Sequence, residues 1–327
     1  MSVAPLIIGA EELRARVHFR DLVEPVSSAF RESARGGAQN GLLTLFPADR
    51  PEDGDVYVKT GVLRGHSVYI VKVSPWFAVN TERGLPQGGF IAAFDSRTGH
   101  TLAILDEQHY LSDIRTAAAG AAAARTLAPP MIEVAAVLGA GTQAFWQAQA
   151  LFGERPFQKL IIWARDEQKA GTLKTRLSRT LPDVAIETST DVESTVRRAD
   201  VVITATLARQ PIVRGEWLHP GQHITAVGAD DPTKCELDAA VLNRARVFVD
   251  CRETALACGD IHRAVREGEY RADLLAGEIG DVLDGSRPGR LTRDDITVAK
   301  FVGIGAQDLV AAEVALRLCS AGAGLRG

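Results

Sequence analysis

Three basic side chains in the first half of the sequence have the chemistry to hold a carboxylate. Lys59 and Lys72 lie in β-rich runs, and Arg115 opens an alanine-rich helix face with few other charges. Strand alternation places Lys72 on the opposite sheet face from its two valine neighbours; the alternative is a solvated lysine at a strand edge. The planar guanidinium of Arg115 suits a two-point grip on a carboxylate or phosphate. The alternative for Arg115 is a salt bridge at a domain interface.

One acidic residue is a candidate for proton transfer. Asp230 follows the apolar run His223–Val227 and a glycine, which is the carboxyl edge where parallel sheets build their sites. A carboxylate there could exchange a proton with an imine or amine nitrogen. Asp231 is an equally acidic neighbour, and the segment Gly228–Pro232 also reads as an ordinary turn.

A glycine-rich turn lies in the middle of the chain. Val134–Leu138 has the length of one buried strand, the G-x-G-x-x-A sequence Gly139–Ala144 follows, and Thr142–Phe152 contains good helix formers. Strand, glycine turn and helix together predict a dinucleotide-binding fingerprint, in which Gly141 lets a pyrophosphate approach the backbone. The helix N-terminus would supply free N–H groups to the phosphates. A plain glycine turn in a βα unit is the alternative.

The end of the next strand indicates which nucleotide is preferred. Leu160–Trp163 is followed by Ala164, where NAD-binding folds usually carry an acidic residue for the ribose 2′-OH. Arg165 could contact a 2′-phosphate instead, so the sequence favours NADP(H). NAD(H) stays the alternative because Asp166 could rotate toward the ribose, and Arg165 could also be a solvated loop arginine.

The remaining pattern predicts an α/β protein. Short β-rich runs between Gly41 and Leu105 indicate a mostly antiparallel sheet, and the alternation of strands and helices after Glu133 indicates a parallel, doubly wound sheet. Helices are predicted at Ala10–Arg16, Asp21–Ala34 (with Asp21 as N-cap), Tyr110–Leu127, Glu167–Thr180, Val192–Ala199, Thr254–Glu267 and Gln307–Cys319.

Length and composition limit the classes of protein to which this chain could belong. The 327 residues favour two domains, and a net charge of −4 suggests neither a nucleic acid nor an anionic membrane as partner. No apolar run approaches the ~20 residues that span a bilayer, and the start lacks the features of a signal peptide. The four cysteines form no C-x-x-C pair and no helix carries H-x-x-x-H, so we expect reduced thiols, no metal site and a cytoplasmic protein.

Further motifs extend over nearly the whole chain. In order, they are Lys59-Thr-Gly61, Val71-Lys-Val73, Gly84-Leu-Pro86, Leu111–Ala119, the glycine turn, Thr204-Ala-Thr206, Ala226–Asp238 and Gly303–Leu309. This series resembles the ornithine cyclodeaminase/μ-crystallin family, and most closely a bacterial branch of it. The resemblance implies a substrate-binding and dimerisation domain (residues 1–128 plus 302–327), an inserted NAD(P)-binding Rossmann domain (129–301), and a homodimer.

The resemblance also assigns roles to matching positions. Lys72 and Arg115 would hold the substrate carboxylate, Asp230 would donate or accept the proton, and Lys234 would contact the cofactor unless it is a surface charge. The expected catalytic residues are Asp230 and Lys72; substrate-binding residues are Lys59, Lys72, Arg115 and Val302; cofactor-binding residues are Gln87, Arg115, Thr116, Gly139, Gly141, Thr142, Gln143, Ala164, Arg165, Thr204, Thr206, Val227, Gly228 and Lys234.

Three departures from the family pattern bear on the reaction. Thr60 stands where ornithine cyclodeaminases carry a methionine, Phe301 replaces a serine, and Ala164 replaces the aspartate that selects NAD. They argue against ornithine and toward NAD(P)H-dependent reduction of a 2-imino acid or cyclic ketimine, which is equivalent to an amino-acid dehydrogenase. A cyclodeaminase that releases ammonia and a non-catalytic ligand-binding protein remain the alternatives.

Overall fold

The computed structural model of the protein describes residues 4–50 and 53–320. It consists of two compact units. The first comprises Met1–Ala118 and Ile304–Gly327, and the second comprises Ala119–Gly303. The chain passes from the first unit to the second within one helix, and it returns at the boundary between Gly303 and Ile304.

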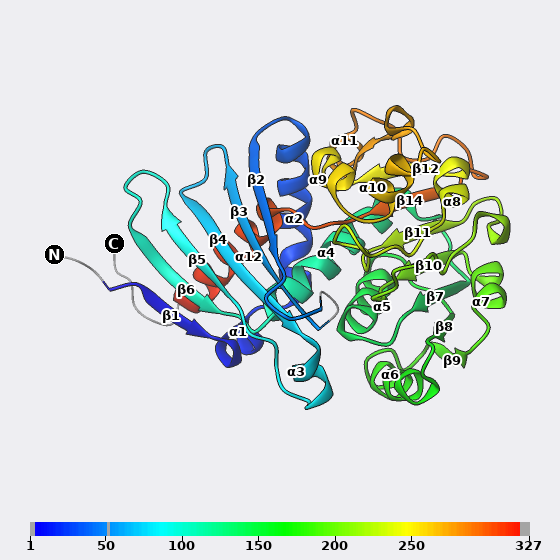
Figure 1. Ribbon diagram of the computed structural model, residues 1–327, viewed down its shortest axis with the longest axis horizontal. Coiled ribbons are helices and arrows are strands. Elements are labelled where there is room, and N and C mark those ends of the chain that lie inside the picture. Colours follow the sequence, from blue (N-terminus) through cyan, green and yellow to red (C-terminus); the bar gives the residue numbers. More distant parts are fainter. Residues whose placement is uncertain (1–3, 51–52, 321–327) are drawn as a thin grey trace. The chain divides into compact units, whose positions relative to one another are not determined.

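The first unit is built on a six-stranded sheet with the order β1-β6-β5-β4-β3-β2 (Figure 1). All neighbouring strands are antiparallel except β1 and β6. Its elements are β1 (Leu6–Gly9), α1 (Ala10–Arg16), α2 (Phe19–Ala34), β2 (Ala38–Leu45), β3 (Gly54–Leu63), β4 (Val68–Phe77), α3 (Ala78–Glu82), β5 (Phe90–Asp95), β6 (Thr101–Asp106), the beginning of α4 (Tyr110–Leu127) and α12 (Gly305–Ser320).

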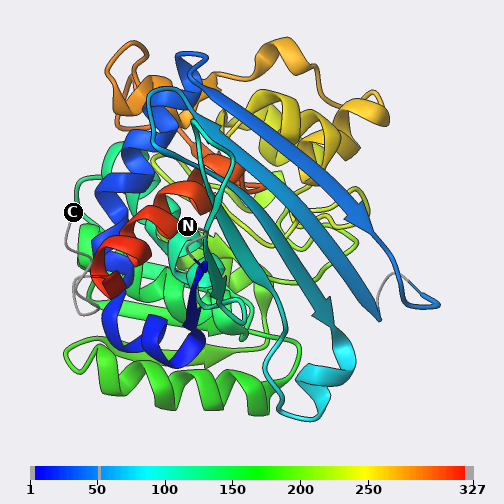
Figure 2. The same cartoon turned by 90° about the vertical axis from the view of Figure 1, so that its left-hand side faces the viewer.

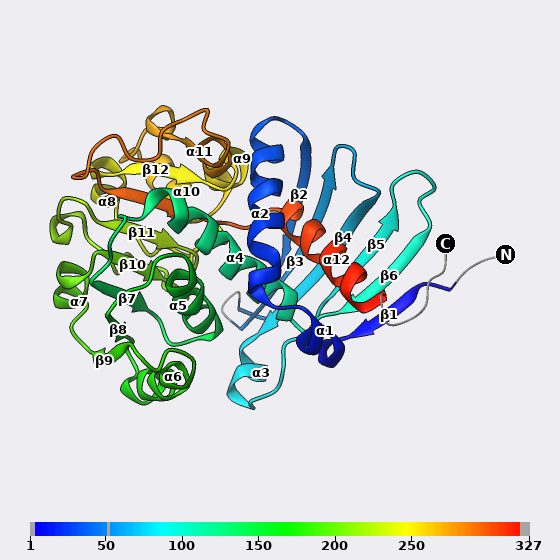
Figure 3. The same ribbon diagram turned by 180° about the vertical axis from the view of Figure 1, so that it is seen from behind.

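One face of this sheet is covered by α12, and α2 packs against α12 on the same side (Figure 3). Close backbone contact fixes the start of α12 on β3, because a Cβ on Gly61 would collide with Gly305, and a Cβ on Gly305 would collide with Thr60. The first turn of α12 is also held by β2, since the Asn40 Oδ1 accepts a hydrogen bond from the Ala306 N–H at 2.9 Å. These contacts set the C-terminal helix over the middle of an N-terminal sheet.

The other face of the sheet, which no helix among the described residues of the first unit covers (Figure 2), carries apolar side chains that stay exposed. Strand alternation directs them away from α12. The most exposed are Ile7, Leu43, Leu45, Val62, Phe90 and Leu102, with 37–64% of their surface accessible. We call this set the open face of the sheet.

The second unit contains an eight-stranded sheet with the order β13-β12-β14-β11-β10-β7-β8-β9. Every pair of neighbouring strands in it is parallel. Its elements are β7 (Val134–Leu138), α5 (Thr142–Glu154), β8 (Lys159–Trp163), α6 (Glu167–Thr180), β9 (Ala185–Ser189), α7 (Val192–Arg198), β10 (Val201–Thr204), η1 (Gly215–Trp217), β11 (His223–Ala226), α8 (Ala239–Arg244), β12 (Arg246–Val249), α9 (Arg252–Ala257), α10 (Gly259–Arg266), η2 (Ala272–Leu274), β13 (Gly277–Glu278), α11 (Ile279–Leu283) and β14 (Thr297–Lys300).

Both faces of this parallel sheet are buried. Along β7, Ala135 and Val137 pack with α5 and α6, whereas Ala136 and Leu138 belong to the core on the opposite face. The strand order reverses at β7, which has β8 on one side and β10 on the other. This is a doubly wound, Rossmann-like sheet, whose topological switch point lies at the carboxyl ends of β7 and β10.

The structure corrects several local predictions. Helix α2 begins at Phe19, because His18 is the N-cap and Asp21 is the third residue of a capping box rather than the cap itself. The single helix predicted at 254–267 is two helices, α9 and α10, because Gly259 adopts a φ of 76°. No helix among residues 4–50 and 53–320 combines the length and the apolar character needed to cross a membrane.

Candidate active site

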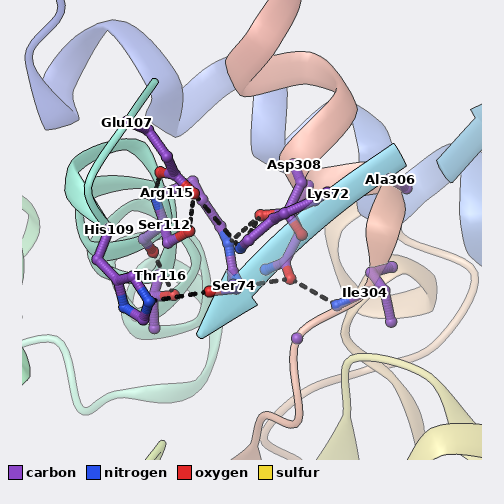
Figure 4. Close-up of polar contacts among 12 residues, drawn as sticks. Lys72, Ser74, Glu107, His109, Ser112, Arg115, Thr116, Ile304, Ala306 and Asp308 are labelled. Atoms are coloured by element: carbon purple, nitrogen blue, oxygen red, sulfur yellow. Dashed lines mark hydrogen bonds and ion pairs between the residues drawn. The ribbon is translucent and has the colours of Figure 1, made fainter. Parts of the chain in front are cut away.

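A cluster of buried charges occupies the first unit beneath α12 (Figure 4). The Lys72 Nζ donates a hydrogen bond to the Asp308 Oδ1 at 3.0 Å, and the Arg115 Nε donates to the same oxygen at 2.8 Å. Lys72 is 1% exposed, Arg115 6% and Asp308 0%. The alternative of a solvated lysine at a strand edge is therefore wrong.

Two neighbouring strands supply the lysines of this cluster. Lys59 on β3 is paired in register with Lys72 on β4, and both side chains lie on the sheet face that α12 covers. Like charges opposite each other on a sheet repel, so they require nearby carboxylates. Glu107 and Asp308 provide these, with Glu107 4.0 Å from the Lys72 Nζ. We call Lys59, Lys72, Arg115, Glu107 and Asp308 the basic cluster.

The two carboxylates of the basic cluster, Glu107 and Asp308, have different partners. Glu107 accepts hydrogen bonds from the Ser112 N–H at 2.7 Å and the Ser112 hydroxyl at 2.6 Å, and so holds the first turn of α4, which carries Arg115. Burial by itself would raise the pKa of Asp308, but the cations of Arg115, Lys72 and Lys59 outweigh burial and hold that pKa well below its usual range. Asp308 is therefore a carboxylate. Three basic side chains thus face two acidic ones in the basic cluster.

Backbone strain lies beside this cluster. Gln108 and His109 are non-glycine residues with φ values of 47° and 64°, a conformation that costs energy and is concentrated at functional sites. The His109 Nε2 lies 3.1 Å from the Ser74 hydroxyl and 2.9 Å from the Pro75 carbonyl oxygen (Figure 4). Burial lowers the pKa of His109, against an opposing effect of Glu107.

In the second unit, the glycine turn has the geometry of a phosphate-binding loop. Gly139 has a φ of 126°, and a Cβ there would collide with the Ala205 carbonyl group. Gly141 is the N-cap of α5 and forms no side-chain capping bond, while the space around its Cβ position is open to 4 Å. Because no side chain projects from Gly141, a phosphate could approach the first turn of α5, which begins at Thr142.

Asp230 and Asp231 differ sharply in their surroundings. Asp231 is 2% exposed, and its Oδ1 accepts hydrogen bonds from the N–H groups of Thr233 and Lys234 and from the Thr233 hydroxyl, so it forms the turn. The side chain of Asp230 is 36% exposed, and its Oδ1 lies 2.7 Å from the Lys234 Nζ. Of the two carboxylates, only Asp230 reaches outward from the loop.

Buried charges fix the loop that carries Asp230. The Lys300 Nζ donates to the Ala229 carbonyl oxygen at 2.6 Å and pairs with the Asp260 Oδ2 at 2.9 Å. The Asp260 Oδ1 in turn accepts hydrogen bonds from the N–H groups of Glu236 and Leu237. The loop before and after Asp230 is therefore held from two sides.

Glu236 ties the same loop to β10. It accepts hydrogen bonds from the Thr204 hydroxyl, from the N–H and hydroxyl of Thr206, and from the Gly228 N–H. Thr204 ends β10, as expected, but both threonine hydroxyls point to Glu236. Val227 is buried and donates its N–H to the Thr204 carbonyl group.

Of the remaining predicted positions, Ala164, Arg165 and Val302 lie in the second unit, and Gln87 and Thr116 lie in the first. Ala164 is buried at the end of β8, and Arg165 next to it is exposed. Val302 is buried, and its N–H is bonded to Asp250. The side-chain amide of Gln87 is bonded to both backbone atoms of Phe77, which fixes the segment after β4. The Thr116 hydroxyl donates to the Ser112 carbonyl oxygen within α4.

The structure thus brings Lys59, Lys72 and Arg115 together within the first unit. Within the second unit it gathers the glycine turn, the two threonines and the Asp230 loop at the carboxyl ends of β7, β10 and β11. Sequence reasoning missed Glu107, His109, Asp308, Glu236, Asp260 and Lys300 as parts of these arrangements. Asp308 and Glu236 did lie in motifs that carry the family resemblance, so their positions were visible before their contacts.

Comparison with known protein families matches residues 4–318 to the ornithine cyclodeaminase/mu-crystallin family. The chain belongs to this family. The resemblance drawn from the motifs is thereby confirmed over almost the whole sequence.

Three similar proteins illustrate the range of the family. The ketimine reductase mu-crystallin of Mus musculus is 31% identical over 98% of this chain and 100% of its own. A structure of the Δ1-pyrroline-2-carboxylate reductase of Thermococcus litoralis in complex with NADH and L-proline has a TM-score of 0.91 at 27% identity, covering 98% of both chains. An archaeal alanine dehydrogenase dimer with bound NAD has a TM-score of 0.89 at 29% identity, covering 99% of this chain and 98% of that one.

Proposed function

We propose that this protein is an NAD(P)H-dependent reductase of a 2-imino acid or cyclic ketimine, acting in reverse as an amino-acid dehydrogenase. The observation that carries the proposal is the convergence of two buried cations, Lys72 and Arg115, on a single carboxylate oxygen. A site that binds one carboxylate in this way has the right donors for the carboxylate of a substrate. The names of the similar proteins, a ketimine reductase and a Δ1-pyrroline-2-carboxylate reductase, support the same reaction class.

Residues 129–301 are proposed to bind the nicotinamide cofactor. The positive φ of Gly139, the open space at Gly141 and the uncapped start of α5 fit a pyrophosphate. When bound, the nicotinamide would supply or accept a hydride at C4. Further contacts are proposed from the predicted cofactor-binding positions Gln87, Arg115, Thr116, Thr142, Gln143, Ala164, Arg165, Thr204, Thr206, Val227, Gly228 and Lys234.

The chain's own side chains would orient the substrate and manage its proton. Lys72 and Arg115, with Lys59 beside them, would hold the carboxylate and so fix the α-carbon, and such positioning is a large part of catalysis. Val302 would contact the substrate. Asp230, the outward carboxylate of its loop, would exchange a proton with the substrate nitrogen, while Lys234 holds it in place by their ion pair.

NADP(H) is the proposed preferred cofactor, although the similar structures contain NADH or NAD. Ala164 leaves no acidic group at the end of β8, and Arg165 is exposed there to meet a 2′-phosphate. Asp166, the nearest carboxylate in sequence, is the N-cap of α6, and its Oδ1 accepts from the N–H groups of Gln168 and Lys169. That role disfavours its rotation toward a ribose hydroxyl.

A homodimer is proposed through the open face of the first unit's sheet, in residues 1–128 plus 302–327. Exposed apolar side chains gathered on one sheet face are typical of an interaction site, and a second copy would cover them with an identical apolar face. The similar alanine dehydrogenase is a dimer. Light scattering should give twice the chain mass, and Leu43→Lys with Val62→Glu should give the monomer; an unchanged mass in this variant would place the interface elsewhere.

The reaction is tested with a panel of cyclic imines, and of 2-oxo acids supplied with amines, read by the absorbance of NADPH and NADH at 340 nm. Steady consumption of reduced cofactor with an imine supports the proposal. Ammonia release from an amino acid without net cofactor change would indicate a cyclodeaminase instead. Saturable ligand binding with neither reaction would indicate a binding protein.

A further inference from the structure

One oxygen of the basic cluster is left without a hydrogen bond. Lys72 and Arg115 both donate to the Oδ1 of Asp308. The Oδ2 of the same carboxylate is buried and has no hydrogen-bond partner among the described residues. A buried, ionised carboxylate oxygen without a partner is unfavourable, because it has lost water and gained nothing in exchange.

A second buried polar atom without a hydrogen-bond partner belongs to the residue before Asp308. The Gln307 Nε2 is also buried and without a partner in the described part of the chain. The orientation of this amide is set by its other end, since the Gln307 Oε1 accepts a hydrogen bond from the Ile304 N–H at 2.9 Å. Among the described residues, the start of α12 therefore offers one unpaired acceptor in the basic cluster, the Asp308 Oδ2, and one unpaired donor beside it, the Gln307 Nε2, whose amide oxygen lies 3.4 Å from the Arg115 Nη1.

These two atoms match the polar groups of an α-imino or α-amino acid. Such a molecule carries an anionic carboxylate and, one carbon away, a nitrogen that is a cationic N–H donor when protonated. The donors Lys72, Arg115 and Gln307 suit the carboxylate, and the Asp308 Oδ2 suits the N–H group. A 2-oxo acid has the same carboxylate but presents an oxygen acceptor in place of the N–H.

We propose that Asp308 binds the protonated nitrogen of the substrate through its Oδ2, and so selects an iminium or ammonium acid over the corresponding 2-oxo acid. This inference rests on the proposed carboxylate site at Lys72 and Arg115. In the reduction, hydride from bound NAD(P)H would bond to the α-carbon, the C=N π electrons would become a lone pair on nitrogen, and Asp230 would deliver a proton to that lone pair. Asp308 stays a carboxylate throughout and takes no proton, which leaves proton transfer to Asp230.

The low pKa of Asp308 agrees with this role. Burial alone would raise this pKa, but the cations of Arg115, Lys72 and Lys59 lower it by more than burial raises it. A carboxylate held ionised is an acceptor only. It is therefore a poor general acid, but a good partner for a cationic N–H group.

The test compares two planar acids of nearly equal shape, pyrrole-2-carboxylate with a ring N–H and furan-2-carboxylate with a ring oxygen. Their dissociation constants are measured by calorimetry on the full-length protein saturated with NADPH, so no turnover is needed. The wild type should bind the pyrrole acid at least tenfold more tightly. In Asp308→Asn, the side-chain oxygen must face the two donors Lys72 and Arg115, so its NH₂ replaces the Oδ2 and the preference should disappear or invert.

Glu107→Gln is the matched control. Glu107 is also a buried carboxylate near Lys72, but both its oxygens are bonded to Ser112. Its replacement should change binding of the two acids by the same factor and leave their ratio unchanged. If Asp308→Asn does not fold, the double variant Lys72→Met/Asp308→Asn, which removes one cation with the carboxylate, should bring the ratio to about one.

The outcomes separate this inference from the proposed function. Equal wild-type affinity for both acids, or an unchanged ratio in the Asp308 variants, overturns the role of Asp308 alone. If Lys72→Met still binds both acids as the wild type does, the carboxylate site at Lys72 is wrong. The proposed function is then contradicted as well.

Discussion

Replacing Lys72 by methionine separates its role in binding from its role in the core. Methionine keeps most of the side-chain length and removes the charge, and the site is 1% exposed, so water cannot easily replace the lost ammonium. In the folded protein Asp308 keeps the hydrogen bond from the Arg115 Nε at 2.8 Å. The carboxylate is thus not left unpaired, and the variant should fold.

The size of the effect follows from the lost hydrogen bond. A hydrogen bond to a charged group contributes about 1.5–3 kcal/mol, and about 1.4 kcal/mol corresponds to a factor of ten. We therefore expect kcat/KM for the imine to fall roughly 10- to 100-fold. Most of the loss should appear in KM, because the carboxylate is bound in both the ground state and the transition state.

The assay is steady-state oxidation of NADPH at 340 nm, with the melting temperature measured on the same samples. Lys159→Met is the control, since Lys159 forms a surface ion pair with Glu187 at 2.6 Å with both side chains about one-third exposed, and such pairs contribute little. The reasoning is refuted if Lys72→Met lowers the melting temperature but leaves KM for the imine unchanged. Lys72 would then be a structural counterion of Asp308.

Three further predictions concern other parts of the protein. Asp230→Asn should lower kcat by about 10²-fold or more with little change in KM for the cofactor, and wild-type turnover would exclude Asp230 as the acid or base. Ala164→Asp should shift the ratio of kcat/KM values from NADPH toward NADH by at least tenfold, and an unchanged ratio would mean that the end of β8 does not contact the ribose. Burial lowers the pKa of His223 to about 3, so the unfolded chain binds a proton that the folded chain does not between about pH 6.5 and 3. Urea unfolding should therefore show stability falling as the pH drops below about 6.5, by at most about 1.4 kcal/mol per pH unit, and His223→Gln should flatten this slope; equal slopes would contradict the burial of a neutral histidine.

Much of the fold could be read from local sequence. Apolar runs bounded by turn residues placed β3 to β6, and strict alternation of strands and helices placed the parallel sheet from β7 onward. The incorrect predictions concern helix ends that are determined by a single residue. His18 was not recognised as a cap because its type is uncommon there, and the break at Gly259 falls within a segment of otherwise helical sequence.

The site could be predicted only in part. The positions of Lys72 and Arg115 followed from strand alternation, helix composition and the family motifs. Their partner Asp308 did not, because it lies 236 residues beyond Lys72 and 193 beyond Arg115 in the chain. Only the packing of α12 on β3, set by Gly61 and Gly305, brings it there, and no periodicity in the sequence reports such a long-range contact. The same reason hid the pair formed by Asp260 and Lys300.

The central claim is that the basic cluster holds the carboxylate of a substrate whose α-carbon receives hydride. A crystal structure of the protein with NADPH and pyrrole-2-carboxylate tests it most directly. The account predicts the carboxylate within hydrogen-bonding distance of Lys72 and Arg115, with the ring facing the nicotinamide. A carboxylate bound away from both cations, with Lys72 and Arg115 still occupied only by Asp308, would contradict it.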